Sequence, residues 1–141
     1  MQSNQLDSTI PVWYCVHTAC TPQQTVIILF FMKQYVIDEL RSADYQALKK
    51  YLDEHYGPAA LGGIYWIPVA AEVLTDTQQE HRECRPHCVA VDLDQNRLAC
   101  ELLVRTQNRV RCSCIGYATE RQFNWLVARI DQIFDRLKIV T

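Results

Sequence analysis

Residues 87–117 decide the fold, and they read HCVAVDLDQNRLACELLVRTQNRVRCSCIGY. This stretch contains three strand-like runs, separated by two short polar segments, at 87–93, 98–104 and 110–117. Alternation of apolar and polar residues favours strands with one buried face, and short connections favour antiparallel neighbours. The stretch therefore predicts a three-stranded antiparallel meander.

The lengths of the two connections set the register of this meander, because a slip of one residue turns every side chain to the opposite face. The first loop places Val91 opposite Cys100 and Val89 opposite Leu102, and the second places Cys100 opposite Cys114. On this register we expect one apolar face to form the core, with the members Val89, Val91, Leu93, Leu98, Cys100, Leu102, Val104, Val110, Cys112 and Cys114.

Two segments carry the pattern of amphipathic helices. Apolar residues recur at helical spacing over residues 42–56, and Gly57 ends that segment. In the second segment, 119–138, Thr119 and Gln122 form a capping box before a single apolar stripe. We predict that both helices pack chiefly on one face of the sheet.

The remaining segments complete an α+β fold. Residues 12–18 and 64–67 have the β-branched and aromatic content of strands. Residues 25–40 favour strand structure with a break near Lys33, and a helix is the alternative there. We predict a flexible tail over 1–9 and one α+β domain over 10–141, with a mainly antiparallel sheet of about five or six strands.

Composition indicates one ordinary soluble domain. The chain has 141 residues, of which 49% are hydrophobic and 21% are charged. Its longest apolar run, residues 26–32, is far shorter than the roughly 20 residues of a membrane-spanning helix. The first residues lack the basic and apolar regions of a signal peptide. We therefore expect a cytoplasmic protein that does not bind a membrane.

The formal net charge of −2 is the sum of two unlike halves. Residues 1–80 hold four Lys or Arg and nine acidic residues, a net −5, whereas residues 81–141 hold ten and seven, a net +3. Because the total is not basic, nucleic acid is not the expected partner. The opposite signs favour docking of the two halves against each other or against a second subunit.

Seven cysteines is a high and odd number for a chain of this length. A secreted disulfide framework is usually shorter and has an even count, so we expect a reducing compartment and mostly free thiols. Cys100, Cys112 and Cys114 fall on the proposed core face, where cysteine behaves as a small apolar residue.

The segment that precedes the meander offers metal-ligating side chains. A short polar helix is expected to begin near Thr75 and to run toward the cluster His81, Cys84, His87 and Cys88. Two imidazoles and two thiols form a donor set that tetrahedral zinc prefers. Because His87 and Cys88 are neighbours that point to opposite faces of a strand, His81, Cys84 and one of these two, with a ligand from elsewhere, converge more easily. The alternative is a polar loop that binds no metal and has no cofactor.

Signs of catalysis are weak. Cys15 and His17 share one face of a predicted strand, which is the minimum for an activated thiol, but no third residue that would orient them is evident. The sequence has no nucleotide-binding glycine motif, no nucleophile elbow and no zinc-protease motif. We therefore favour a protein that is not an enzyme.

The opposite face of the predicted meander suits a protein contact. It combines apolar residues with basic ones, namely Leu103, Ile115 and Tyr117 with Arg105, Arg109 and Arg111. Apolar residues set among charges are typical of interfaces. We predict an interaction or regulatory module that self-associates or binds a protein partner, with a zinc-binding or thiol-dependent protein as the alternative.

Overall fold

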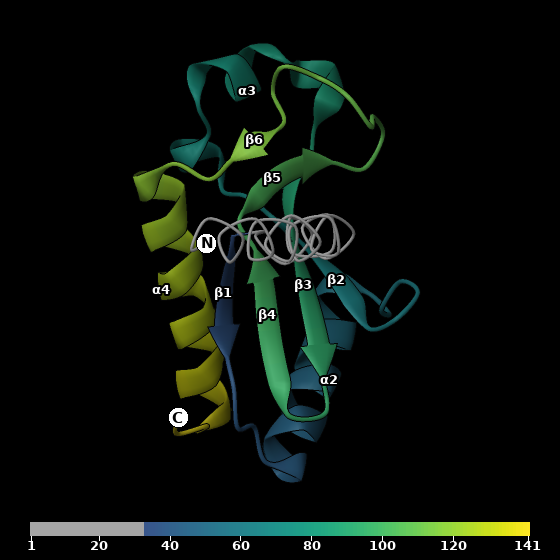
Figure 1. Ribbon diagram of the computed structural model, residues 1–141, viewed down its shortest axis with the longest axis vertical. Coiled ribbons are helices and arrows are strands. Elements are labelled where there is room, and N and C mark those ends of the chain that lie inside the picture. The colour runs from purple at the N-terminus through teal and green to yellow at the C-terminus, as the bar shows by residue number, and fades with distance from the viewer. Residues whose placement is uncertain (1–32) are drawn as a thin grey trace, which may run out of the picture. The chain divides into compact units, whose positions relative to one another are not determined.

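The computed structural model describes residues 33–141 of the chain, in which a sheet is flanked by helices (Figure 1). The predicted tail over 1–9, the predicted strand over 12–18, and Cys15 and His17 lie outside the described residues. The elements, in chain order, are β1 (Gln34–Ile37), α2 (Ser42–Tyr56), β2 (Ile64–Pro68), η2 (Ala71–Val73), α3 (Asp76–Glu80), η3 (Arg82–Cys84), β3 (His87–Asp94), β4 (Arg97–Glu101), β5 (Leu103–Thr106), β6 (Gly116–Tyr117) and α4 (Glu120–Leu137).

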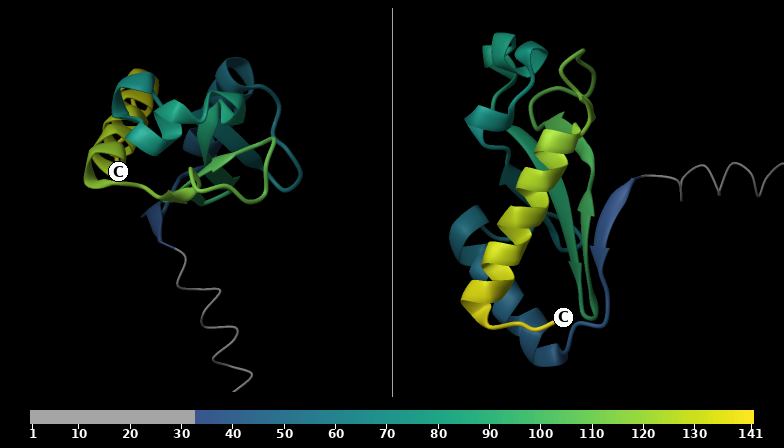
Figure 2. Two further views of the ribbon diagram at one scale, coloured as in Figure 1. Left: turned by 90° about the horizontal axis from the view of Figure 1, so that it is seen from above. Right: turned by 90° about the vertical axis from the view of Figure 1, so that its left-hand side faces the viewer.

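The strands form an antiparallel sheet in the order β1-β4-β3-β5-β6, and β2 pairs with the other edge of β3. Helices α2 and α4 lie on the same side of this sheet (Figure 2). The α+β class, the sheet of six described strands and the helices on one face are as predicted. No helix in the described part of the chain combines the length and the apolar character that a membrane crossing requires.

The core lies between the sheet and the two long helices. The apolar stripe of α4 includes Leu126, Ile130 and Ile133, which are at most 2% exposed. They belong to the same buried cluster as Leu48 of α2. The predicted capping box starts α4, because Thr119 Oγ1 accepts a hydrogen bond from the backbone of Gln122 at 3.3 Å. Burial of this stripe is the main reason that the helix is stable, since isolated helices of this length are marginal.

The predicted register holds for the first hairpin and fails beyond it. Val91 pairs with Cys100, as expected. The same register would place Cys88 opposite Leu103, but Cys88 pairs with Arg105, so the predicted pairing of Val89 with Leu102 is wrong. The physical reason is a break between β4 and β5, where Leu102 donates a backbone hydrogen bond to Lys33. A slip of two residues keeps Val104 on the buried face, because strand side chains alternate with a period of two.

The predicted third strand of the meander is also wrong for most of its length. Only β6 pairs with β5, and residues 107–115 form a loop in which Val110 is 94% exposed. The predicted pairing of Cys100 with Cys114 therefore does not form. This loop has few apolar side chains to bury, and its two cysteines turn toward a different part of the molecule.

Candidate metal centre

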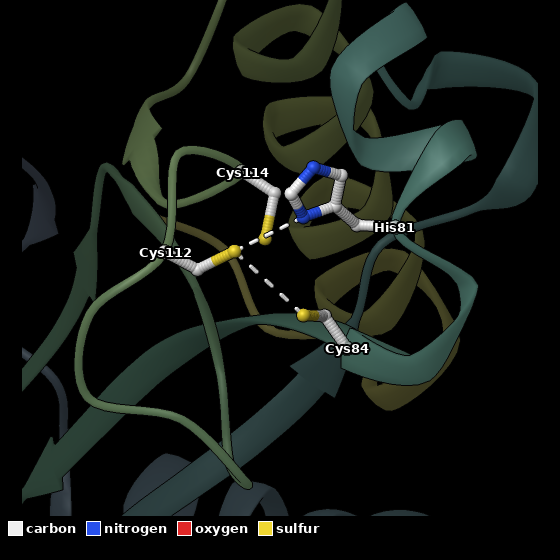
Figure 3. A group of neighbouring side chains, drawn as sticks. All are labelled: His81, Cys84, Cys112 and Cys114. Carbon is white, nitrogen blue, oxygen red and sulfur yellow. Dashed lines mark hydrogen bonds between the residues drawn. The ribbon is translucent and has the colours of Figure 1, made fainter.

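Four side chains from two distant segments converge at one end of the sheet (Figure 3). They are His81, Cys84, Cys112 and Cys114, and their ligating atoms all lie within 4.8 Å of one another. Figure 3 shows the three sulfur atoms and the imidazole pointing toward a common centre. Three thiols and one imidazole form one of the donor sets of structural zinc sites.

The first pair of donors is placed by the end of a helix. A capping box of Thr75 and Gln78 starts α3, and His81 ends it by donating its backbone N–H to Thr77. The chain then turns at once into η3, in which the backbone N–H of Cys84 bonds to the carbonyl oxygen of His81 at 3.1 Å. A spacing of three residues within such a tight turn brings both side chains to the same side.

The second pair lies in the loop between β5 and β6. The backbone N–H of Ile115 donates to the carbonyl oxygen of Cys112 at 3.1 Å and closes a turn around Ser113. This turn directs the Cys112 and Cys114 side chains toward the first pair (Figure 3). Cys84 and Cys114 are buried, whereas His81 and Cys112 are half-buried, so the group sits just beneath the surface.

The separations suit a tetrahedral ion. Zinc–sulfur bonds of about 2.3 Å place the sulfur atoms of a tetrahedron about 3.8 Å apart. The Sγ atoms of Cys84 and Cys112 are 3.8 Å apart. The Nδ1 atom of His81 lies 3.0 Å from Cys112 Sγ, and it would move outward by about half an ångström to become a ligand.

The pKa values of the thiols differ because the thiols form different hydrogen bonds and are buried to different extents. Hydrogen bonds from the backbone and the thiol of Cys114, and from His81, lower the pKa of Cys112. Burial raises the pKa of Cys114 and of Cys84, and at Cys84 the positive charge of Arg109 acts in the opposite direction. A divalent cation replaces the shared protons, since metal ligation requires the thiolate form.

Buried amides brace the second pair of donors against the helices. Gln78 Nε2 donates to the carbonyl oxygen of Cys114 at 3.3 Å, and Gln122 Nε2 donates to Gln78 Oε1 at 2.7 Å. Both glutamines are buried, and both also serve in capping boxes, of α3 and α4 respectively. Side chains that orient a metal-binding loop tune a site almost as strongly as the ligands themselves.

A second hydrogen bond ties the loop to the first pair. Asn108 Nδ2 donates to the carbonyl oxygen of Glu83 at 2.8 Å, one residue before Cys84. The two segments that carry the donors are thus held together at both ends of the group, by this bond and by that of Gln78. The polypeptide brings the four donors into proximity by itself, which lowers the conformational cost of binding an ion.

The structure unites only half of the cluster that the sequence predicts. His81 and Cys84 belong to the group, whereas His87 and Cys88 lie in β3 and are not part of it. Neither ring nitrogen of His87 has a hydrogen-bond partner among the described residues. Cys88 donates to the carbonyl oxygen of Pro86, and burial raises its pKa to about 11.

Of the three cysteines that the sequence places on the core face of the meander, only Cys100 lies there. Cys100 is fully buried among apolar residues, as predicted, and burial raises its pKa to about 12. The assignment of Cys112 and Cys114 to the core face of a strand is wrong, because residues 107–115 form a loop. All five cysteines of the described part are free thiols.

Cys112 and Cys114 are thus the two members of the site that sequence reasoning misses. A signal is present: Cys-x-Cys at 112–114 and His-x-x-Cys at 81–84 form two short pairs of donors separated in sequence. Structural zinc sites are commonly built from two such pairs. The period-two spacing of the cysteines imitates strand alternation, although the flanking residues Arg111 and Ser113 are polar.

The predicted contact surface is only partly held by internal contacts. Arg105 forms a two-point ion pair with Glu101, whereas Arg109 and Arg111 make no ion pair with any described residue. Leu103 and Ile115 are half-buried. Tyr117 is 52% exposed, and the Nζ atom of Lys33 lies 5.2 Å from the centre of its ring.

Comparison with known proteins assigns no relationship. No protein-family model matches the chain, and no curated protein or solved structure shows significant similarity to it. Function is therefore inferred from the geometry and chemistry of the residues themselves.

Proposed function

We propose that this chain is a zinc-binding domain in which His81, Cys84, Cys112 and Cys114 hold one structural Zn²⁺ ion. The observation that carries the proposal is the convergence of four donor atoms, from two segments far apart in sequence, within 4.8 Å. Zinc suits this set better than calcium or magnesium, which prefer oxygen ligands. Three sulfur atoms and one nitrogen complete a tetrahedron. A catalytic zinc site keeps one position open for water or substrate, and this group leaves none, so we assign a structural role to the ion.

The role of the ion in this proposal is to hold the loop over 107–115 in place. That loop buries little apolar surface, as the exposure of Val110 illustrates, and it is held mainly by hydrogen bonds such as those of Gln78 and Asn108. A bound ion supplies the free energy that burial does not, because ligand binding to the folded state stabilises that state. The domain is therefore expected to be folded around β3 and β4 without zinc, and complete only with it.

Elemental analysis of the purified protein, prepared under reducing conditions, tests the proposal. We expect one zinc per chain, and a Cys114→Ser variant should lose it. Cys88→Ser is the matched control, since Cys88 is a similarly buried thiol in β3 outside the group, and it should keep the metal. Cobalt substitution should produce the intense visible absorption of tetrahedral thiolate ligation.

Two outcomes of the zinc measurement contradict the proposal. Wild-type protein that neither contains zinc nor takes it up when zinc is added would exclude a zinc site. Loss of zinc from Cys88→Ser with retention in Cys114→Ser would instead support the cluster of His81, Cys84, His87 and Cys88. If the protein binds no zinc, a thiol-dependent role remains as the alternative for Cys112, whose pKa is lowered by its neighbours.

We also propose that the domain serves protein interaction, as the sequence predicts. The supporting observation is that Leu103, Arg105, Arg109 and Ile115 line one cleft on the sheet face away from α2 and α4. Light scattering of the zinc-loaded protein tests the self-association that the sequence favours. A mass that stays monomeric at high concentration would exclude self-association and leave a different protein as the partner.

A further inference from the structure

A cleft opens on the sheet face opposite to α2 and α4, and its volume is about 410 Å³. Its apolar lining comes from three places: Trp66 in β2, Leu103 in β5, and Val110 and Ile115 in the loop between β5 and β6. The neighbours of Trp66 in β2 are buried in the core, so the alternation of a strand puts the indole on the outer face. A cleft of this volume is large enough for one or two side chains of a ligand.

Basic residues line the same cleft. Arg105 and Arg109 both contribute to its walls, and Arg111 lies two residues beyond Arg109 on the exposed loop. The charge of Arg105 is matched by Glu101, whereas Arg109 and Arg111 have no acidic partner among the described residues. The cleft therefore combines an apolar floor with the guanidinium of Arg109, which has no carboxylate partner in the described part of the chain, and Arg111 follows on the same exposed loop. A guanidinium binds carboxylates well.

We infer that this cleft binds a short acidic peptide segment of a partner protein, with an apolar side chain in the cleft and carboxylates on Arg109 and Arg111. A peptide fits better than a small metabolite, because the cleft is open to solvent and Arg111 lies beyond its lining, on the exposed loop. Charge at the rim and apolar area at the centre is the usual arrangement of a protein interface.

The metal centre and the cleft share one segment of chain. The loop that provides Cys112 and Cys114 to the metal group also provides Arg109, Val110 and Ile115 to the cleft. The binding of a peptide in the cleft rests on the proposed interaction function and specifies its ligand. In this inference, the loop that holds the zinc also forms one wall of the peptide-binding cleft. Removal of zinc should therefore weaken peptide binding even though no metal ligand contacts the peptide.

Titration of the zinc-loaded full-length protein with two peptides, followed by two-dimensional NMR, tests the inference. The probes are acetyl-EELFEE-amide and its basic counterpart acetyl-KKLFKK-amide. We expect the acidic peptide to shift the indole N–H of Trp66 and the backbone amides of Leu103 and Ile115, and the basic peptide to leave them unchanged. Chelation of zinc should weaken binding of the acidic peptide by at least about fivefold.

Charge-reversal variants localise the contact. Arg109→Glu should weaken binding of the acidic peptide by about fivefold or more, because it replaces attraction with repulsion at the rim. Lys50→Glu is the matched control, since it makes the same change of charge on an exposed residue of α2 and should leave the affinity unchanged. Both variants are surface changes, so their NMR spectra should show the wild-type fold.

Each of three results would overturn the inference. The first is no shift of the cleft signals at millimolar peptide, and the second is an equal response to both peptides or to both charge reversals. The third is a dimer, seen by sedimentation, that dissociates in Arg109→Glu, because the cleft would then be occupied by a second copy of the chain. The zinc measurement is independent: a chain that lacks zinc but binds the acidic peptide contradicts the zinc proposal and supports this one.

Discussion

Replacement of His87 by leucine should stabilise the protein, although the residue is buried in the central strand. His87 is 2% exposed, and neither of its ring nitrogens has a hydrogen-bond partner among the described residues. A buried polar group without a partner costs about 1–3 kcal/mol. Leucine is close to histidine in volume and has no polar atom, so His87→Leu removes this cost without opening a large cavity.

The gain in the free energy of unfolding from His87→Leu should increase as the pH falls. Burial, followed by the charges of Arg85 and His81, lowers the pKa of His87 below its usual value near 6.5. Below about pH 6.5 the unfolded chain therefore binds a proton that the folded chain does not, and the free energy of unfolding falls by up to about 1.4 kcal/mol per pH unit. The wild type should lose this contribution on acidification, and His87→Leu should not.

Urea denaturation of both proteins, at about pH 7 and about pH 5.5, measures the effect. We expect His87→Leu to exceed the wild type by about 1 kcal/mol at the higher pH and by about 2 kcal/mol at the lower one. Other titrating groups, including the metal ligands, are common to both proteins and cancel in the difference. The zinc content should be equal.

Two results would refute this reasoning. Destabilisation of His87→Leu by more than about 1 kcal/mol at neutral pH would mean that the imidazole has a partner that stabilises it. Loss of zinc from the variant would mean that His87 is a ligand, as the sequence alone suggests. If the difference in the free energy of unfolding between the two proteins does not change with pH, the lowered pKa of His87 is refuted, but the cost of its unpartnered nitrogens is not.

Three further predictions concern the brace, the core and the loop. Gln122→Ala removes the bond from the Thr119 backbone to the Gln122 side chain, which is one half of the capping box, and the bond to Gln78. It should lower the free energy of unfolding by about 1–2 kcal/mol, whereas Gln132→Ala on the exposed face of the same helix should be neutral. Ile130→Ala, which empties a fully buried position, should cost about 2–5 kcal/mol in the same urea assay, and a cost below about 1 kcal/mol would contradict the described core. Chelation of zinc should greatly speed tryptic cleavage after Arg109 without affecting cleavage in α2, and equal rates with and without the chelator would show that zinc does not order the loop.

Much of the fold could be predicted because its strongest signals are local. The capping box at Thr119 and the apolar stripe that follows it act within one helix, so the sequence placed α4 correctly. The first hairpin was also predictable, since the short polar connection and the alternating side chains leave one register that buries Val91 and Cys100 together. The sheet class followed from these elements.

The break after β4 was not predictable in the same way. At the break, the backbone of Leu102 bonds to Lys33 and to Ala118, and neither residue belongs to β3. Lys33 extends the pairing of β1 with β4, and Ala118 lies just before α4, so no local pattern reveals either partner. As a result the register shifts by two residues, and the loop over 107–115 leaves the sheet.

The candidate site divides in the same manner. The sequence by itself determined the donor types and the local pair of His81 and Cys84, because one helix end and one tight turn place both side chains. Only the tertiary structure decided that Cys112 and Cys114, rather than His87 and Cys88, complete the group. The reason is physical: spacing within one turn is a property of the local backbone, whereas convergence of two segments depends on the register of the sheet and on the buried glutamines that hold the loop against it.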